Sequence, residues 1–164
     1  MSHAVTAPRP GSSPEALYAD LLQALGGLLT GERDPVANLA NASALLYASL
    51  PDLNWAGFYL LKDGGLVVGP FQGKPACVRI ALGQGVCGTA ATRRETVIVA
   101  DVHAFAGHIA CDAASNSEIV VPMLAGDRLI GVLDLDSPRP GRFGAADARG
   151  LEAFVARLIA ATDC

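Results

Sequence analysis

The chain has 164 residues, of which 51% are hydrophobic and 17% are charged, and its formal net charge is −4. This composition excludes disorder over most of the chain, and no apolar run reaches the roughly 18 residues that a membrane span needs. The mild acidity and the lack of a basic block argue against a nucleic-acid-binding surface.

Two helices are predicted in the first third of the chain, after a disordered leader over residues 1–12. The first helix begins at 13–15, where Ser, Pro and Glu supply an N-cap, a first-turn proline and a first-turn acid. Leucines then recur at helical spacing until Gly31. The second helix is predicted over 35–49, with Val36 among the residues of one apolar face.

The middle of the chain predicts short strands joined by tight turns. Residues 55–62 and 66–71 form a hairpin around Asp63-Gly64-Gly65. The remaining predicted elements are a strand at 77–81, a turn and helix at 83–93, a strand at 96–100, a hairpin at 118–124 and 129–135, and a closing helix at 144–161. This order predicts an α+β fold with five or six antiparallel strands, in one domain over 13–164. The irregular loop at 101–117 is long enough to indicate a functional segment.

Three of the four cysteines lie inside this domain, and Cys164 ends the chain. No secretory signal is recognisable, so we expect a cytoplasmic protein whose cysteines are reactive, metal-bound or inert rather than structural disulfides. Cys111 lies in the polar loop and Cys77 heads a strand. Cys87 lies at the start of a predicted helix, and helix N-termini lower the pKa of thiols. For each of them, a small buried apolar side chain is the alternative interpretation.

A metal site is a weaker alternative. His103, His108 and Cys111 are possible ligands, but their spacing is unlike that of zinc sites. Hydrogen bonding within the loop is the preferred interpretation of the two histidines.

The acidic residues of the second hairpin give a sharper signal. Asp134 and Asp136 are two apart on one strand, so both side chains lie on the same face of the sheet. The hairpin brings Glu118 opposite residues 134–137. Acids that lie this close raise one another's pKa, so one of them stays protonated. The alternative is that Asp136 only caps the following turn.

Two aromatic residues on the first strand also share a face. Trp55 and Tyr59 are four apart. Their apolar rings with polar tips suit the wall of a pocket, and ordinary core packing is the alternative.

Seven segments form a distinctive ordered set, at 54–61, 69–77, 85–90, 101–105, 107–112, 117–122 and 131–137. Together they resemble the free methionine-(R)-sulfoxide reductases, which are built on a single GAF domain, and the likeness extends over about 18–158. The resemblance implies an antiparallel six-stranded sheet with helices on both sides, a homodimer, and reduction of free L-methionine-(R)-sulfoxide. Neither a metal nor an organic cofactor is needed for this reaction.

The resemblance also implies roles for the cysteines. Cys111 is expected to attack the sulfoxide sulfur and become a sulfenic acid. Cys77 is the main candidate for the resolving thiol, and Cys87 is an additional resolving or relay thiol, although the division between these two stays open. Thioredoxin is the expected reductant of the resulting disulfide.

The substrate pocket implied by the resemblance contains Trp55, Tyr59, Glu118, Asp134 and Asp136. We expect Glu118 or Asp136 to donate a proton to the sulfoxide oxygen. Asp134, with Glu118, is expected to hold the substrate ammonium group, and the backbone N–H groups of 114–117, around Ser115 and Ser117, to hold its carboxylate. The main alternative function is a GAF-type sensor of a small ligand such as a cyclic nucleotide, because the fold alone does not decide between them.

Overall fold

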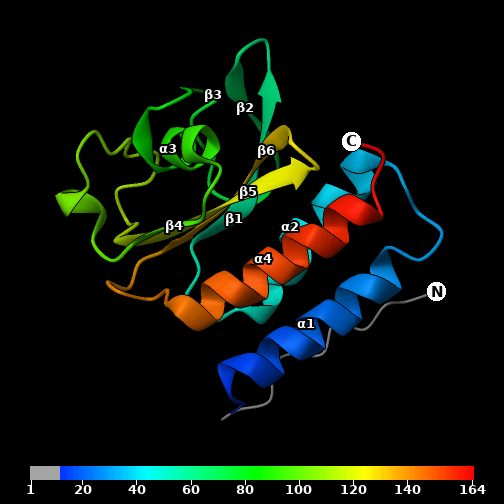
Figure 1. Ribbon diagram of the computed structural model, residues 1–164. Coiled ribbons are helices and arrows are strands. Elements are labelled where there is room, and N and C mark those ends of the chain that lie inside the picture. Colours follow the sequence, from blue (N-terminus) through cyan, green and yellow to red (C-terminus); the bar gives the residue numbers. More distant parts are fainter. Residues whose placement is uncertain (1–11) are drawn as a thin grey trace.

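The computed structural model describes residues 12–164, so the predicted leader lies outside the described residues except for Ser12. Six antiparallel strands form one sheet in the order β3-β2-β1-β6-β5-β4. Helices α2 and α4 pack on one face and α1 packs on these two helices, while α3 lies on the opposite face (Figure 1). The predicted α+β architecture, with helices on both sides of a six-stranded sheet, is confirmed.

Side-chain caps fix the starts of the first two helices. Helix α1, Pro14–Leu28, begins after Ser13, and helix α2, Pro35–Ser49, begins after Asp34; each cap side chain accepts a backbone hydrogen bond from the first turn. The prediction for Val36 was wrong, because this residue is 67% exposed. It lies three helical turns before Tyr47, so the two residues share the outer side of α2.

Tight turns connect the hairpin strands. Strands β1, Trp55–Lys62, and β2, Gly65–Gly73, are joined by Asp63 and Gly64, whose φ angles of 52° and 79° are those that a type I′ turn requires. The remaining elements are β3 Arg79–Ala81, α3 Gly85–Arg93, β4 Val97–Val99, the 3₁₀ helix η1 Val102–Ala104, β5 Ser117–Ala125, β6 Arg128–Ser137 and α4 Ala145–Ala160. Strand β3 begins two residues later than predicted, so Cys77 lies in the segment that precedes it.

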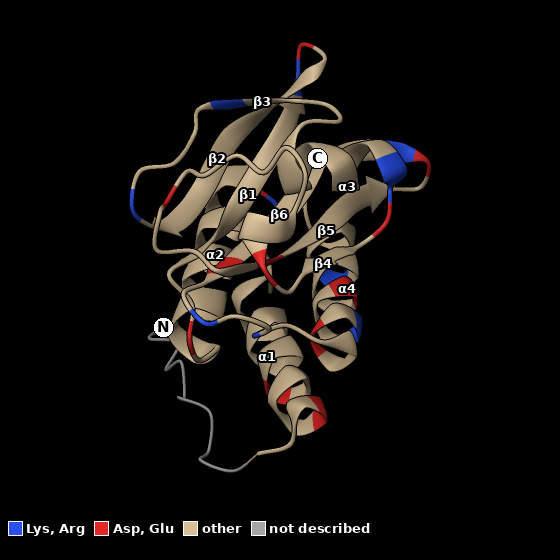
Figure 2. Cartoon of the chain, turned by 90° about the vertical axis from the view of Figure 1, so that its left-hand side faces the viewer, with Lys and Arg blue, Asp and Glu red and all other residues tan. Residues whose placement is uncertain are grey.

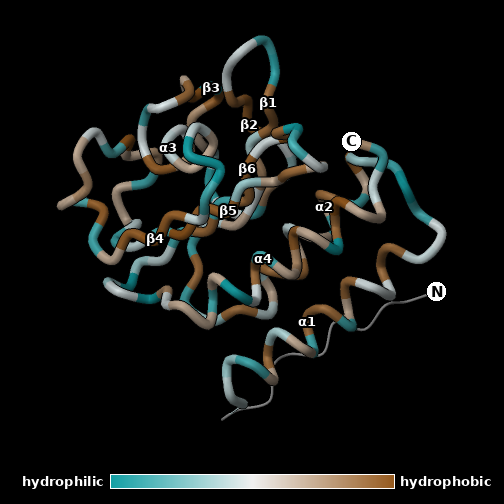
Figure 3. Tube along the Cα trace, in the orientation of Figure 1, coloured by the Kyte–Doolittle hydropathy of each residue, from teal (hydrophilic) through white to brown (hydrophobic). Residues whose placement is uncertain are grey.

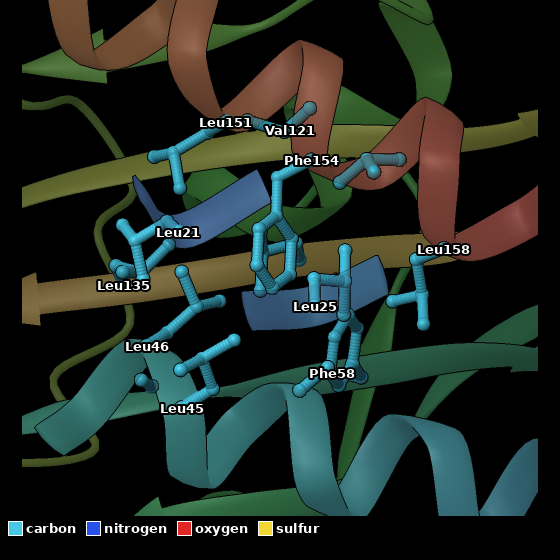
Figure 4. Packing of buried hydrophobic residues seen from close by; sticks show 14 of the residues in the cluster. Leu21, Leu25, Leu45, Leu46, Phe58, Val121, Leu135, Leu151, Phe154 and Leu158 are labelled. Atoms are coloured by element: carbon cyan, nitrogen blue, oxygen red, sulfur yellow. The ribbon is translucent and has the colours of Figure 1, made fainter. Parts of the chain in front are cut away.

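The sheet has an apolar core on each side. On the side of α1, α2 and α4, residues such as Leu25, Leu46 and Phe154 pack against Phe58 of β1 (Figure 4). These helices alternate hydrophobic and hydrophilic segments along their length (Figure 3). A smaller core under α3 contains side chains of β1, β5 and β6 that point the other way.

Side chains along β5 and β6 alternate between the two faces of the sheet, and this alternation decides on which face the polar residues lie. Ile119 and Leu135 belong to the core on the α1, α2 and α4 side, whereas Val120 and Val132 belong to the core under α3. Side chains two residues apart share a face, so Glu118, with Asp134 and Asp136, is directed to the α3 side.

Charged residues are spread over several helices, hairpin turns and loops of the described chain (Figure 2). None of the helices within residues 12–164 combines the length and apolar character that crossing a membrane requires.

Candidate active site

A cavity lies on the α3 side of the sheet. Its floor is formed by β1, β5 and β6, and its rim by the N-terminus of α3, the segment 74–76 and the loop 108–115. Of the ten residues that the sequence indicated as site residues, eight line this cavity: Trp55, Tyr59, Cys87, Cys111, Ser115, Glu118, Asp134 and Asp136.

A disulfide bond joins Cys77 to Cys111, and Cys111 lines the cavity. The Cα atoms of the two cysteines are 5.6 Å apart, which lies in the usual range for disulfides. The backbones of the two segments are therefore at the separation that this bond requires. Cys111 is exposed and Cys77 is partly buried. These two cysteines are therefore bonded to each other, while Cys87 and Cys164 are free thiols.

The three acids of the second hairpin meet as the sequence indicated. Glu118 pairs across the strands with Asp136, and Val120 with Asp134. Desolvation by burial raises the pKa of all three carboxyl groups well above the usual values, and each is raised further by the charge of a neighbouring acid. Burial and mutual repulsion therefore favour the protonated forms of these carboxyl groups.

One atom of this cluster lacks a partner. Asp134 is buried, and its Oδ1 has no hydrogen-bond partner among the residues that the structure describes. A buried polar atom without a partner is costly, and this one lines the cavity. A positively charged group that enters the cavity would satisfy it.

Cys87 lies at the bottom of the cavity, under the first turn of α3. Its Sγ is 3.9 Å from Oε1 of Glu118, and the residue is buried. Burial, followed by the charges of Asp134 and Glu118, raises the pKa of this thiol well above its usual value. The expectation that the helix N-terminus makes Cys87 more acidic is therefore wrong, because desolvation and the neighbouring acids outweigh the helix.

Aromatic rings form the wall next to the disulfide. The ring of Trp55 stacks on Tyr59 and on Phe71, with centroid separations of 5.8 and 5.2 Å. The indole N–H of Trp55 donates to the carbonyl of Lys74 at 3.1 Å, and the hydroxyl of Tyr59 donates to the carbonyl of Cys77 at 3.0 Å. The wall residues thus also hold the segment that carries one cysteine of the disulfide.

A polar network that the sequence did not predict holds the segment that carries Cys111. The side-chain amide of Asn54 donates to Asp112 at 3.3 Å and to Ser115 at 3.0 Å. Lys74 lies 3.6 Å from the same Asp112 carboxylate. The backbone N–H of Ala114 and these partners lower the pKa of Asp112. Asn54 and Asp112 flank Trp55 and Cys111 and belong to the segments 54–61 and 107–112, and these were their only signals in the sequence.

The predicted backbone cradle at 114–117 is not available as expected. The N–H groups of Ala114 and Ser115 donate to Asp112, and that of Asn116 donates to the carbonyl of Ser137. Ser117 lies on the opposite face of the sheet, where its hydroxyl donates to the carbonyl of Arg139. Of the two serines, only Ser115 lines the cavity, because neighbouring strand residues point to opposite faces.

The metal set proposed from the histidines does not come together. His103 is exposed and its Nε2 lies 3.1 Å from Oδ1 of Asn116, while the sulfur of Cys111 is bonded to Cys77. His108 turns into the cavity instead, with Nε2 3.6 Å from Oε2 of Glu118.

The GAF domain family model matches residues 41–161. The free methionine-R-sulfoxide reductase of Escherichia coli is 58% identical over 149 residues, which cover 89% of this chain and 90% of that protein. This chain belongs to the GAF-domain family of free methionine-R-sulfoxide reductases. The Saccharomyces cerevisiae member is 46% identical and covers 88% of this chain and 84% of its own length.

Solved structures of this reductase family have the same fold. The free methionine-R-sulfoxide reductase of Neisseria meningitidis in complex with its substrate superposes with a TM-score of 0.92 at 42% identity. The alignment covers 98% of this chain and 95% of that one.

Proposed function

We propose that this protein reduces free methionine-(R)-sulfoxide to methionine, as the names of its relatives state for those proteins. The observation that carries the proposal is the Cys77–Cys111 disulfide beside a cavity with three buried carboxyl groups. Reduction of a sulfoxide requires a soft nucleophile at sulfur and an acid at oxygen, and this cavity offers both.

Cys111 is the proposed nucleophile. Its thiolate attacks the sulfoxide sulfur while the carboxyl group of Glu118 or Asp136 gives a proton to the oxygen. The oxygen ends as a sulfenic acid on Cys111, the sulfoxide is reduced by two electrons, and methionine leaves. The raised pKa values of these acids support this role, because they favour the protonated carboxyl group that an acid catalyst needs.

Cys77 is the proposed resolving thiol. It attacks the sulfenic sulfur of Cys111, a disulfide forms and water leaves. The bond between these two residues supports this choice over Cys87, whose sulfur lies buried beside Glu118.

The site also supports recognition of a free amino acid. The unpartnered Oδ1 of Asp134 suits the substrate ammonium group, and the stacked ring of Trp55 suits its S-methyl group. A peptide-bound sulfoxide has no free ammonium group, so it would leave that oxygen without a partner. For the substrate carboxylate, Ser115 lines the cavity, whereas the hydroxyl of Ser117 is bonded to the carbonyl of Arg139 on the opposite face.

Thioredoxin is the proposed reductant, in the cytoplasm, and we expect a homodimer. Thiol exchange needs an accessible sulfur, and Cys111 is exposed. The exposed apolar residues Val78 and Ile109 lie within two positions of the bonded cysteines and offer a docking surface. Self-association is supported by the uncharged outer side of α2, where Val36 and Tyr47 are exposed.

A single-turnover experiment tests the function. The fully reduced protein is mixed with free methionine-(R)-sulfoxide without any reductant, and methionine and free thiols are counted. We expect one methionine per chain and the loss of two of the four thiols. Free (S)-sulfoxide and a peptide-bound sulfoxide should release nothing.

Cysteine variants assign the roles. Cys111→Ser should release no methionine, while Cys77→Ser should release one per chain but fail to turn over with thioredoxin. Cys164→Ser is the matched control and should behave as the unaltered protein. A protein that binds the sulfoxide without losing thiols would be a sensor, and the proposal would be wrong.

A further inference from the structure

We propose that His108 accepts the proton that Cys111 releases and then passes this proton to Glu118. Each turnover then leaves His108 neutral and Glu118 protonated, ready for the next. The inference rests on the proposed reductase function. In the proposed reaction the nucleophile Cys111 must lose a proton, and the acid Glu118 must regain one.

The position of His108 supports this role. Its Nε2 lies 3.6 Å from Oε2 of Glu118, and the imidazole side chain is 14% exposed. His108 lies three residues before Cys111 in the same loop, and both line the cavity. Three residues of backbone span at most about 11 Å, so the two residues belong to one small region of the loop.

Atoms and protons balance in the proposed reaction. The Cys111 thiol gives its proton to His108, and Glu118 gives its proton to the sulfoxide oxygen. The products are a sulfenic acid, methionine, an imidazolium and a carboxylate. The imidazolium, which faces the carboxylate, then returns the proton, so the sum is a thiol plus a sulfoxide giving a sulfenic acid plus methionine.

The surroundings favour histidine as this carrier. Partial burial lowers the pKa of His108 from its ordinary 6.5, so the ring is neutral near pH 7 and ready to accept a proton. Lys74 is engaged with Asp112, 3.6 Å away, and both belong to the rim. The ionisable groups that line the same cavity are Tyr59 of β1, Lys74, Cys87 of α3, Asp112, Glu118 of β5, and Asp134 and Asp136 of β6.

A pH series separates proton transfer from a structural role. The first-turnover rate of methionine release is measured for His108→Ala and His108→Gln between pH 6.5 and 9. A thiol with the ordinary pKa of about 8.5 is about 3% ionised at pH 7 and about three quarters ionised at pH 9. Both variants should therefore be about 30-fold slower than the unaltered protein at pH 7 and within about twofold at pH 9.

Added imidazole gives a second readout. It should restore the rate of His108→Ala, where the side chain leaves space, and should have no effect on His108→Gln. His103→Ala is the matched control, because His103 is exposed in the same loop and bonded to Asn116 outside the cavity. Its rate should equal that of the unaltered protein at every pH.

Two results would overturn the inference. One is an unchanged rate in both His108 variants at pH 7. The other is a defect that stays constant from pH 6.5 to 9 and does not respond to imidazole, which would assign His108 to loop structure alone. If the unaltered protein itself releases no methionine, the proposed function fails, and that result is recognised independently.

Discussion

The hydroxyl group of Tyr59 donates a 3.0 Å hydrogen bond to the backbone carbonyl of Cys77. A residue of the sheet floor thus holds the backbone of a cysteine in an irregular segment. The sequence indicated Tyr59 as part of a substrate wall, and the structure adds this contact with the cysteine that we propose as the resolving thiol.

Removal of that hydrogen bond should slow disulfide formation. In Tyr59→Phe the ring stays, but the carbonyl of Cys77 loses a bond worth about 1 kcal/mol, so we expect disulfide formation about fivefold slower. The release of methionine in the first turnover should change less. Quenched-flow alkylation measures both, with the exposed Tyr47→Phe as control. Equal rates of disulfide formation in Tyr59→Phe and the unaltered protein would contradict the role.

Asp134→Asn should weaken substrate binding. A hydrogen bond to a charged group such as the substrate ammonium contributes about 1.5–3 kcal/mol, so the dissociation constant for free methionine-(R)-sulfoxide should rise about 10- to 160-fold. Calorimetry in a Cys111→Ser background measures binding without turnover. Asp127→Asn, in the exposed turn between β5 and β6, is the matched control. An unchanged dissociation constant would remove Asp134 from ammonium recognition.

The buried acids should make the ligand-free protein less stable as the pH rises. Each carboxyl group of Glu118, Asp134 and Asp136 has a folded-state pKa above its unfolded value near 4. At a pH between the unfolded and the folded pKa values, the folded state therefore binds more protons than the unfolded state. The free energy of unfolding therefore falls as pH increases from about 4 through the raised pKa values. Denaturant titrations should show a shallower fall for Asp134→Asn. An identical pH slope would mean that this acid does not titrate on unfolding.

Reduction of the disulfide should lower stability. The bond joins residues 34 positions apart, and the chain-entropy model gives about 3–4 kcal/mol for a loop of that size. The midpoint of thermal unfolding should fall by about 10 °C in dithiothreitol. Cys77→Ser should unfold at the same temperature with and without the reductant, and an equal fall in that variant would point to another cause.

Local sequence signals predicted most of the fold. The capping residues Ser13 and Asp34 and the turn at Asp63-Gly64 act within a few positions, so they fix element starts without tertiary information. Val36 shows the limit. Its hydropathy favours burial, but which side of α2 meets the sheet depends on packing that the helix sequence does not contain.

The site was predictable where strand pairing governs it. The period of two placed Asp134 and Asp136 together, and the hairpin placed Glu118 opposite Asp136. Contacts between irregular segments had no such rule. The link from Asn54 to Asp112 depends on where the loop packs against the start of β1, and the loss of the backbone cradle depends on how the loop folds back onto itself.

The close approach of Cys77 and Cys111 has a consequence for survival in an oxidising cell. A sulfenic acid that waits for a partner can react with peroxide and pass to the sulfinic acid, from which thiols do not recover it. Two Cα atoms 5.6 Å apart let the partner thiol reach the oxidised sulfur before a second oxidant does. Under the proposed mechanism, the bond that completes a turnover also shields the protein from irreversible damage by peroxide.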